Sequence, residues 1–330
     1  MLEDDLPSGF IDDLKTGVTY EMLEEEYDIS RSKARNMFDH MREHGYPVEF
    51  QEINQHGKRE FYLPDESGNS YVFDEDNGRY HIALLSDTHL GAKYTHENDL
   101  EDYYKRLRDR GVKHFFHSGD ISDGWEIYEG QLNGTVPEAH GWQNMMDYTI
   151  ENYPDVDGAH TFFIMGNHDR KLYKREGVNI GKIIDEYRED LHYIGDSRAD
   201  IVLDEENDIN LELLHPLRGD TYTLGYRLQT LYRERPLDDR PTIAAVGHLH
   251  SSMFAKSEGV YGFYTGAWKD LSTFNKRQGH AADIGGWELE LLVEDGEIRE
   301  LRPNWIGYSA FEKDNQYSMK DINEFLEGDE

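Results

Sequence analysis

Five short apolar runs recur along the chain, and each ends abruptly in polar residues that include Asp, Asn or His. The runs cover residues 81–85, 112–116, 161–165, 209–214 and 242–246. A short apolar run bounded by polar residues is typical of a buried strand. Because open α/β sheets build their functional sites at the carboxyl ends of strands, we expect the polar residues behind the five runs to form one site.

Other stretches predict the elements around these strands. Helical spacing of apolar positions predicts helices at residues 98–110, 144–152, 178–189 and 222–233. Residues 287–293 and 298–305 surround Glu294-Asp295-Gly296, which predicts a late hairpin. Together with the five strands, these elements predict an α/β body over residues 76–310, followed by an acidic tail at residues 311–330.

Residues 1–75 predict a separate small domain. Three helical segments, at residues 8–16, 19–27 and 30–44, precede two alternating runs at residues 48–53 and 59–63. Thr19 and Ser30 are suited to cap the second and third helices, and Gly45 to end the third. Three helices followed by a hairpin resemble a winged helix-turn-helix domain.

In such a domain the third helix enters the major groove of DNA and the hairpin contacts the backbone. Basic residues of this chain cluster at those two places, with Arg31, Lys33 and Arg35 on the third helix and Lys58 and Arg59 at the tip of the hairpin. We therefore expect these five residues to contact nucleic acid. The alternative is a domain that docks a protein partner or forms a homodimer.

The chain as a whole is strongly acidic. Its 330 residues include 34 basic and 68 acidic side chains, which give a formal net charge of −34. The acidic residues are spread over every segment. This distribution predicts adaptation to a high-salt cytoplasm, in an extreme halophile or a virus of one, where salt screens the repulsion between like charges. The alternative is simply a very soluble surface.

The sequence also indicates where the protein is located and excludes chemistry that requires cysteine. No apolar stretch is long enough to cross a membrane, and the acidic N-terminus lacks the apolar segment of a signal peptide. We therefore expect a cytoplasmic protein without membrane contact. Cysteine is absent, which excludes disulfides and thiolate metal sites.

The residues behind the five apolar runs are ligand types of a transition-metal site. They are Asp87 and His89, Asp120 and Asp123, Asn167 and His168, His215, and His248 and His250. Oxygen and imidazole ligands without cysteine suit Mn²⁺, Fe, Zn²⁺ or Ni²⁺. The long loop 124–141, which is rich in glycine and aromatic residues, follows this set directly. We expect the loop to shape a substrate pocket, the alternative being a surface loop that packs its own aromatic residues.

The order of these motifs resembles that of the calcineurin-like metallophosphoesterases. The shared pattern is Asp-x-His, Gly-Asp-x-x-Asp, Gly-Asn-His-Asp, a lone His and Gly-His-x-His, and the resemblance covers residues 80–310. Periodicity alone predicts a generic α/β fold. The resemblance implies more: an α/β (α+β) fold with a four-layer β-sandwich flanked by helices, and two divalent metal ions, with Mn²⁺ the first candidate.

The resemblance also implies a role for each candidate residue. One metal would be held by Asp87, His89 and His250, the second by Asn167, His215 and His248, and both by the bridging Asp120. His168 would protonate the leaving group, with Asp123 orienting its ring.

Two positions separate branches of the family. Ser/Thr protein phosphatases have Arg and Glu where this chain has Gly124 and Asp169, whereas its Asp87-Thr88-His89-Leu90-Gly91 resembles DNA repair nucleases and bacterial phosphodiesterases. The resemblance implies a phosphodiesterase or nuclease that acts on DNA or other nucleic acid by in-line attack of a metal-bridging hydroxide. One alternative is a phosphomonoesterase or cyclic-nucleotide phosphodiesterase that uses the winged helix for docking. Another is a non-enzymatic DNA-binding regulator.

Overall fold

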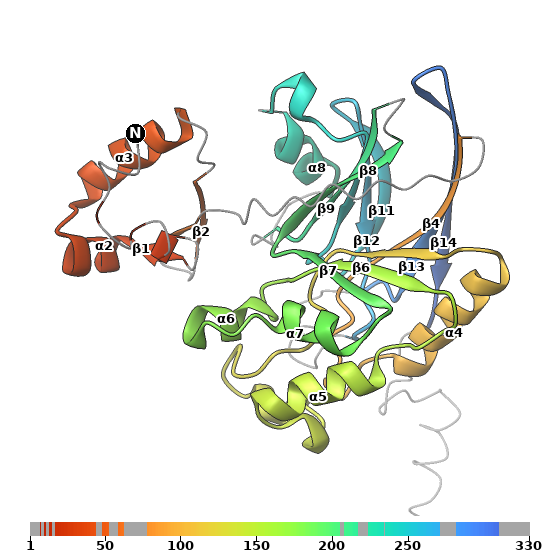
Figure 1. The fold of residues 1–330 in the computed structure, drawn as a ribbon, viewed down its shortest axis with the longest axis horizontal. Coiled ribbons are helices and arrows are strands. Elements are labelled where there is room, and N and C mark those ends of the chain that lie inside the picture. Colours follow the sequence, from red (N-terminus) through yellow and green to blue (C-terminus); the bar gives the residue numbers. More distant parts are fainter. Residues whose placement is uncertain are drawn as a thin grey trace, which may run out of the picture.

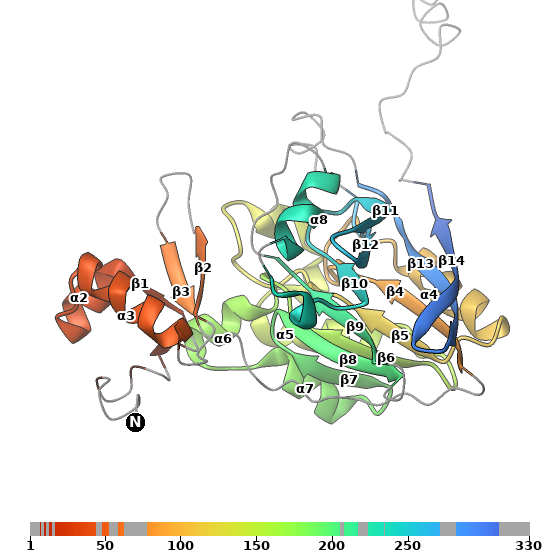
Figure 2. The same cartoon turned by 90° about the horizontal axis from the view of Figure 1, so that it is seen from above.

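The computed structural model describes residues 7, 10, 13–14, 17–43, 48–52, 59–62, 78–204, 208–216, 224–233, 235–270 and 282–309 (Figure 1). From residue 78 onward the chain forms two β-sheets that pack face to face, with helices on both outer surfaces (Figure 2). Among the described residues, no helix combines the length and the apolar character that crossing a membrane requires.

In this part of the chain the large sheet has the strand order β14-β13-β4-β5-β6-β7. Its strands are β4 (Arg79–Leu85), β5 (His114–His117), β6 (His160–Ile164), β7 (Leu191–Gly195), β13 (Gly285–Glu294) and β14 (Glu297–Gly307). The four strands from β4 to β7 are parallel, and β13 runs antiparallel to β4. β13 and β14 form the predicted late hairpin, with the turn at Asp295-Gly296.

The small sheet has the order β11-β12-β10-β9-β8 in the described chain. Its strands are β8 (Arg198–Asp204), β9 (Ile209–Leu214), β10 (Ile243–Val246), β11 (Ser252–Ser257) and β12 (Val260–Thr265). β9, β10 and β12 are parallel, and the two edge strands are antiparallel to their neighbours. Each sheet therefore has a parallel centre, and the five predicted strands all lie in these two centres.

The strands are apolar on both faces because both faces of each sheet are covered. On β4, Ile82 and Leu84 pack between the sheets, whereas Ala83 and Leu85 pack against the outer helices. The helices over the large sheet are α4 (Glu97–Asp109), α5 (Trp142–Asn152) and α7 (Ile180–Tyr187), and α8 (Leu224–Tyr232) covers the small sheet. These four layers confirm the fold expected from the sequence.

Shorter elements complete the body. They are α6 (Arg170–Glu176) and the 3₁₀ helices η3 (Gln131–Gly134), η4 (Pro137–Ala139) and η5 (Leu237–Asp239). The loop 124–141, expected to be irregular, therefore contains two short 3₁₀ helices. α6 begins directly after Gly166-Asn167-His168-Asp169.

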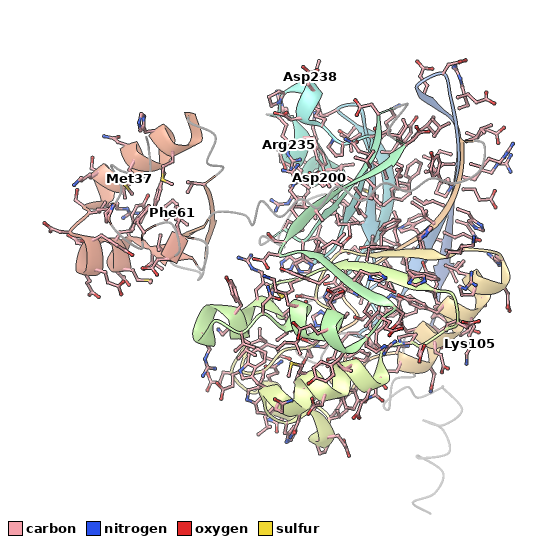
Figure 3. All side chains as sticks on the ribbon, in the orientation of Figure 1. Met37, Phe61, Lys105, Asp200, Arg235 and Asp238 are labelled. Carbon is pink, nitrogen blue, oxygen red and sulfur yellow. The ribbon has the colours of Figure 1, made fainter. Side chains whose placement is uncertain are left out.

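The N-terminal part contains β1 (Val18–Thr19), α2 (Tyr20–Tyr27), α3 (Arg31–Glu43), β2 (Glu49–Glu52) and β3 (Arg59–Tyr62), and these strands form an antiparallel sheet in the order β1-β3-β2. Thr19 caps α2 as expected, since its hydroxyl accepts a hydrogen bond from the Met22 amide at 3.3 Å. Phe61 from β3 and Met37 from α3 lie in the apolar core of this unit (Figure 3). Most of the first expected helix, the tip of the hairpin with Lys58, and the tail 311–330 lie outside the described residues. The winged helix-turn-helix interpretation stays a prediction.

Candidate metal centre

Loops at the carboxyl ends of β4, β5, β6, β9 and β10 meet at one end of the two sheets. They bring together all nine side chains singled out from the sequence: Asp87, His89, Asp120, Asp123, Asn167, His168, His215, His248 and His250. Backbone hydrogen bonds tie the loops to one another, from the Asp87 amide to the Gly119 carbonyl at 2.9 Å and from the His89 amide to the Asp120 carbonyl at 3.1 Å. The parallel centres of both sheets thus deliver their polar ends to one place, as the strand pattern predicts.

The backbone at this centre is held in an unusual conformation. Ten described residues other than glycine have positive φ, and five of these ten are expected metal ligands. They are Asp87 at 53°, His89 at 46°, Asp120 at 56°, His248 at 74° and His250 at 51°. Residues with a Cβ rarely adopt this left-handed region, and they persist in it where the surroundings fix them, most often at functional sites.

A first group of possible ligand atoms comprises Asp87, His89 and His250. The Nε2 atom of His250 lies 3.3 Å from Asp87 Oδ1 and 3.1 Å from His89 Nε2. Asp87 is fully buried, and its Oδ1 atom accepts no hydrogen bond from the described residues. A buried carboxylate oxygen without a donor, facing two imidazole nitrogens, is an arrangement that a cation would satisfy.

A second group comprises Asp120, His215 and His248, with Asn167 beside them. His215 Nδ1 lies 2.7 Å from the Ser118 carbonyl, which only accepts, so Nδ1 carries the hydrogen. In neutral His215 the lone pair is then on Nε2, which lies 3.1 Å from Asn167 Oδ1 and 3.3 Å from Asp120 Oδ2. Three acceptor atoms therefore converge at one point, and this set also fits a cation.

Asp120 stands between the two groups. Its Oδ2 atom is 3.3 Å from His215 Nε2 and 3.7 Å from His89 Nε2, while its Oδ1 atom accepts the His168 amide at 2.8 Å. Gly166 allows this approach, because a Cβ at that position would overlap the Asp120 backbone nitrogen and carboxylate. One carboxylate oxygen thus lies within reach of both histidines, which suits a ligand shared by two cations.

His168 is held by Asp123 through the main chain. Its Nδ1 atom donates to the Asp123 carbonyl at 2.7 Å, whereas the Asp123 carboxylate oxygen Oδ1 lies 3.7 Å away. The expected orienting residue is therefore in place, but its carbonyl makes the closer contact. A donor on Nδ1 leaves Nε2 as the ring atom that can give a proton to a substrate.

The Asp123 carboxylate contacts His89 and two residues that the sequence did not single out, Lys269 and Gln131. Oδ1 lies 2.5 Å from Lys269 Nζ and 3.1 Å from His89 Nδ1, and Oδ2 accepts from Gln131 Nε2 at 3.0 Å. Asp123, His89 and His168 are also close enough to form a third group of ligand atoms. The ammonium group of Lys269 already supplies the cation there.

In the sequence, Asp169 served only to distinguish branches of the family. In the structure, it holds two loops of the centre together. Its buried carboxylate accepts the amides of Gly166 at 2.9 Å, Ile121 at 3.0 Å and Ser122 at 2.9 Å, and the Ser122 hydroxyl at 2.8 Å. These bonds join the loop after β6 to the loop after β5. Its place in Gly-Asn-His-Asp was an available signal, whereas no sequence motif marks Lys269.

Charged groups within the centre lower the pKa of its carboxylate Asp120 and raise the pKa values of His215 and His89. Burial opposes ionisation of Asp120, but the nearby His215 and His168 hold its pKa well below the usual range. Burial likewise opposes the charged form of His215, yet the carboxylates of Asp120 and Asp87 raise its pKa to about 9. The pKa of His89 also rises to about 9, because Asp123, Asp87 and Asp120 outweigh burial and Lys269. In the metal-free protein, His215 and His89 therefore each carry an additional proton, which a bound cation would displace.

Burial dominates at the two other histidines. It lowers the pKa of His168 to about 4, although Asp120 and Asp123 act in the opposite direction. It lowers the pKa of His248 to about 3, helped by the charge of His215. Both rings are neutral near pH 7, and neutral imidazole is the form that binds metal.

The residues expected to contact nucleic acid lie in the N-terminal unit. Arg31, Lys33 and Arg35 are exposed on α3, and the Arg31 guanidinium lies 4.6 Å from the centre of the Tyr20 ring. The backbone of Arg59 lies in β3. These positions leave the three α3 side chains accessible to a partner.

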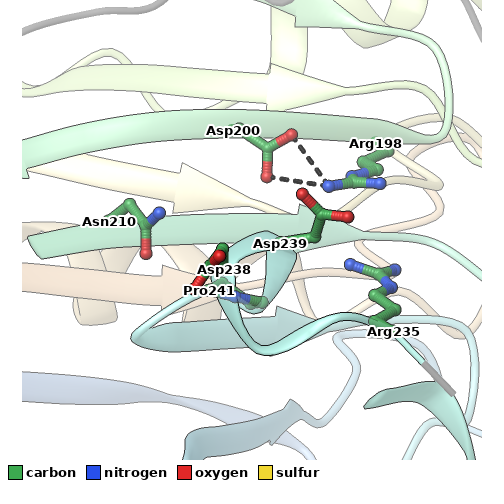
Figure 4. Close-up of a pocket in the computed structure, with 7 residues that line it drawn as sticks. All are labelled: Arg198, Asp200, Asn210, Arg235, Asp238, Asp239 and Pro241. Atoms are coloured by element: carbon green, nitrogen blue, oxygen red, sulfur yellow. Dashed lines mark hydrogen bonds and ion pairs between the residues drawn. The ribbon is translucent and has the colours of Figure 1, made fainter. Parts of the chain in front are cut away.

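A polar pocket of about 500 Å³ lies elsewhere, along the small sheet (Figure 4). Its Arg198 and Arg235 both reach the buried Glu212 carboxylate, at 2.9 and 2.5 Å, and Arg198 also pairs with Asp200 at 3.0 Å. The chain itself neutralises these guanidinium groups, and no expected site residue lines the pocket. The metal centre is therefore the better candidate for function.

The chain is similar in sequence to known proteins. Two curated relatives are named DNA polymerase II small subunit. The protein from Thermoplasma acidophilum is 22% identical over 242 residues, which are 62% of this chain and 49% of the relative. The protein from Archaeoglobus fulgidus is 24% identical over 240 residues, which are 60% of this chain and 48% of the relative. The chain thus spans about half the length of the curated relatives it matches.

Among solved structures, an archaeal phosphodiesterase is 14% identical with a TM-score of 0.38, over 69% of this chain and 100% of that structure. The sequence profile of the calcineurin-like phosphoesterase family matches residues 80–276, which contain every strand end at the centre and exclude the N-terminal unit. With more than half of its length matched and the ordered ligand motifs inside the match, the chain belongs to the calcineurin-like phosphoesterase family.

Proposed function

We propose that the chain is a two-metal phosphodiesterase that acts on nucleic acid. The observation that carries this proposal is the position of Asp120, whose Oδ2 atom lies 3.3 Å from His215 Nε2 and 3.7 Å from His89 Nε2. A carboxylate shared by two sets of ligands is what a pair of cations requires. Family membership supports hydrolysis of a phosphoric ester.

The residues that would hold the cations divide as the motifs suggest. Asp87, His89 and His250 would hold one, and Asn167, His215 and His248 the other, with Asp120 shared. Bound divalent cations, Mn²⁺ first among the candidates, would activate water and neutralise charge on the phosphoryl group. Ser118 fixes the His215 ring through its carbonyl, so that Nε2 stays directed at the centre.

His168 would supply the proton for the leaving group. Its Nδ1 hydrogen is committed to the Asp123 carbonyl, which fixes the ring and leaves Nε2 to exchange a proton. The low pKa of the buried ring would rise when a phosphoester anion binds beside it, since a nearby negative charge favours imidazolium. This gives a general acid that is charged when the substrate is bound.

Nucleic acid is the proposed substrate for two reasons. The curated relatives are named as subunits of a DNA polymerase, and Arg31, Lys33 and Arg35 form an exposed basic group on α3 of an acidic chain. We propose that the N-terminal unit is a winged helix that presents α3 to DNA. The name of the relatives also supports a protein partner, so a role within a larger nucleic-acid assembly is the second candidate function.

The decisive experiment is a matrix of metals and substrates. Purified protein would be loaded with Mn²⁺, Fe²⁺, Zn²⁺ or Ni²⁺ and assayed on methyl p-nitrophenyl phosphate, p-nitrophenyl phosphate and a single-stranded oligonucleotide. The proposal expects diester and oligonucleotide cleavage that disappears in Asp120→Asn. Hydrolysis of the monoester alone would favour a phosphomonoesterase. Inactivity with every metal, together with retained DNA binding, would favour a regulator.

The assay should include multimolar KCl. With a net charge of −34, the acidic side chains repel one another and any nucleic acid at low ionic strength. Concentrated salt limits the range of this repulsion to a few Å. We propose that the protein works in such salt, as a halophilic protein would. Activity that rises with salt would support that proposal, and activity that falls steadily from low salt would contradict it.

A further inference from the structure

We propose that a pocket beside the metal centre, lined by Trp125, Tyr128 and Leu132, binds the nucleobase next to the scissile phosphate. The pocket has a volume of about 390 Å³ and is formed by residues between Trp125 and Leu132. This volume falls within the ~300–1,000 Å³ typical of sites for small ligands. The inference rests on the proposed function and names the group that the site would recognise besides the phosphate.

One end of the pocket loop is fixed to Asp123. Gln131 is only 3% exposed, and its Nε2 atom donates to the Asp123 carbonyl at 2.8 Å and carboxylate at 3.0 Å. Its Oε1 atom accepts the Ile127 amide at 2.8 Å, which closes the turn that carries Tyr128. The pocket is therefore held by the same residue whose carbonyl orients His168.

The other end of the loop is fixed to the segment that follows His89. Ala92 forms a β-bridge with Thr135, and the amides of Lys93 and Val136 donate to the Gly134 and Gly91 carbonyls, each at 2.9 Å. Both ends of the pocket loop are thus bonded to loops that carry expected ligands. A pocket clamped in this way is formed before any substrate arrives, which lowers the entropy cost of binding.

The side chains in the pocket suit a flat aromatic group. Tyr128 is 47% exposed and Leu132 is 53% exposed, while Trp125 is half-buried with its ring centre 5.6 Å from that of His140. Exposed aromatic side chains are platforms on which bases stack whatever their sequence. The backbone of Tyr94, whose side chain is 45% exposed, lies beside the residue that follows Lys269, because its carbonyl accepts the Asp270 amide at 2.9 Å.

Charge decides which part of a nucleotide would enter. Glu126 and Glu129 also line the pocket. Arg175 pairs with Glu126 at 2.5 Å, so it is the exposed Glu129 that would repel a phosphate group there and not an uncharged base. The charges of Lys269 and Asp123 both act on the Tyr128 hydroxyl, which places it within electrostatic reach of the centre. A phosphate at the metals and a base on Tyr128 are therefore compatible, and the reverse arrangement is not.

A base in this pocket must be unstacked from its neighbours. The substrate is therefore a single strand or a frayed end. Stacking of the base in the pocket should raise kcat/KM by about 5- to 150-fold. Two chromogenic diesters that both release p-nitrophenolate measure the contribution of the nucleoside: the p-nitrophenyl ester of thymidine 5′-phosphate carries a sugar and a base, and methyl p-nitrophenyl phosphate carries neither. The wild-type protein should prefer the nucleoside ester by this factor, mainly through KM.

Substitutions test whether the pocket is responsible. Tyr128→Ala and Leu132→Ala should each reduce the preference for the nucleoside ester several-fold, and Tyr128→Phe should keep it because the ring remains. Both positions are about half exposed, so the fold should tolerate the changes. Tyr187→Ala is the matched control, since Tyr187 is 72% exposed at the C-terminal end of α7, away from the strand ends at the centre.

Three results would overturn the inference. Equal kcat/KM of the wild-type protein for the two diesters would remove the base site and leave the phosphodiesterase intact. An equal loss on both diesters in Tyr128→Ala and Leu132→Ala would assign the loop a structural role only. A wild-type protein inactive on both diesters with every metal would remove the proposed function, and the base site with it.

Discussion

The ammonium group of Lys269 lies 2.5 Å from Oδ1 of Asp123, inside the candidate metal centre. The Asp123 carboxylate is fully buried and the Lys269 side chain is 13% exposed. Protein phosphatases of this family carry an Arg directly after this Asp, where the present chain has Gly124. Lys269, in the loop after β12, thus supplies the cation beside Asp123, because the adjacent Gly124 carries no charge.

We expect Lys269→Met to lower the free energy of unfolding by about 3 kcal/mol, because it removes the nearer of the two cationic side chains, Lys269 and His89, that face the buried Asp123 carboxylate. Lys269→Arg should recover part of the loss. Denaturant unfolding of the metal-free proteins measures both. Lys105→Met is the control, since Lys105 is exposed on α4 and its partner Glu101 is exposed as well (Figure 3). A Lys269→Met protein as stable as the control would show that the ion pair contributes nothing.

Asp120→Asn should weaken both metal sites, whereas His250→Ala should weaken mainly the first. The reason is that Asp120 Oδ2 lies between His89 and His215, whereas the His250 ring approaches Asp87 and His89 among the described ligand residues. Elemental analysis after metal loading and dialysis checks this, with His192→Ala as the control because His192 lies on β7 and pairs with His160. Equal metal content in the wild-type protein and Asp120→Asn would argue against a shared ligand.

His168→Ala should retain metal and lose about 10²–10⁴-fold in kcat on a diester with a poor leaving group. The loss should shrink with p-nitrophenolate, which leaves without protonation. Asp123→Asn should keep His168 oriented, because the Asp123 carbonyl is the bonded atom, and should act instead through Lys269 and His89. Rates on a series of aryl and alkyl leaving groups check this. A loss independent of the leaving group would remove His168 from the role of acid.

Metal affinity should rise with pH up to about 9 and then level off. In the metal-free protein the pKa values of His89 and His215 are raised to about 9, so metal binding near pH 7 must release about two protons. These folded-state values exceed the unfolded value of 6.5. Protonation therefore stabilises the metal-free fold fully below pH 6.5, and this contribution is lost as the pH rises through about 9. Calorimetric titration in buffers of different ionisation enthalpy counts the protons, and an affinity that stays constant from pH 7 to 9 would contradict the prediction.

Replacing both Arg31 and Arg35 by Glu should weaken cleavage of an oligonucleotide at least tenfold and spare that of methyl p-nitrophenyl phosphate. Both side chains are exposed on α3, whereas Ala34 and Phe38 form its buried face. The change therefore alters charge without altering the core of the N-terminal unit. The double substitution of Glu24 and Glu25 by Lys on α2 is the control, because it changes the net charge by the same amount with the opposite sign on another exposed helix, and it should not weaken cleavage. Unchanged oligonucleotide cleavage by the Arg variant would show that α3 does not recruit nucleic acid.

The sequence predicted the central strands and the candidate ligand residues. Buried parallel strands are apolar on both faces, so the five strands at the centres of the sheets stand out as continuous runs. Their polar ends fall at the site because parallel strands bring their carboxyl ends to one edge. The edge strand β14 was predicted as part of the late hairpin, but the edge strands β7, β8 and β11 were not identified, and β11 shows why. Along Ser252–Ser257 it alternates between half-buried and exposed positions, so its sequence lacks an apolar run.

Other contacts of the site follow from tertiary packing alone. Lys269 meets Asp123 across 146 positions of sequence, and no local pattern encodes such a separation. The structure also showed that the carbonyl of Asp123, not its carboxylate, bonds His168, because side-chain direction depends on backbone torsions that residue type does not fix. The pocket at Tyr128 depends on Gln131, which bonds Asp123, and on Thr135, which forms a β-bridge with Ala92 of another loop. Residue spacing therefore indicates which side chains come together at the site, and packing determines which atoms each of them contacts.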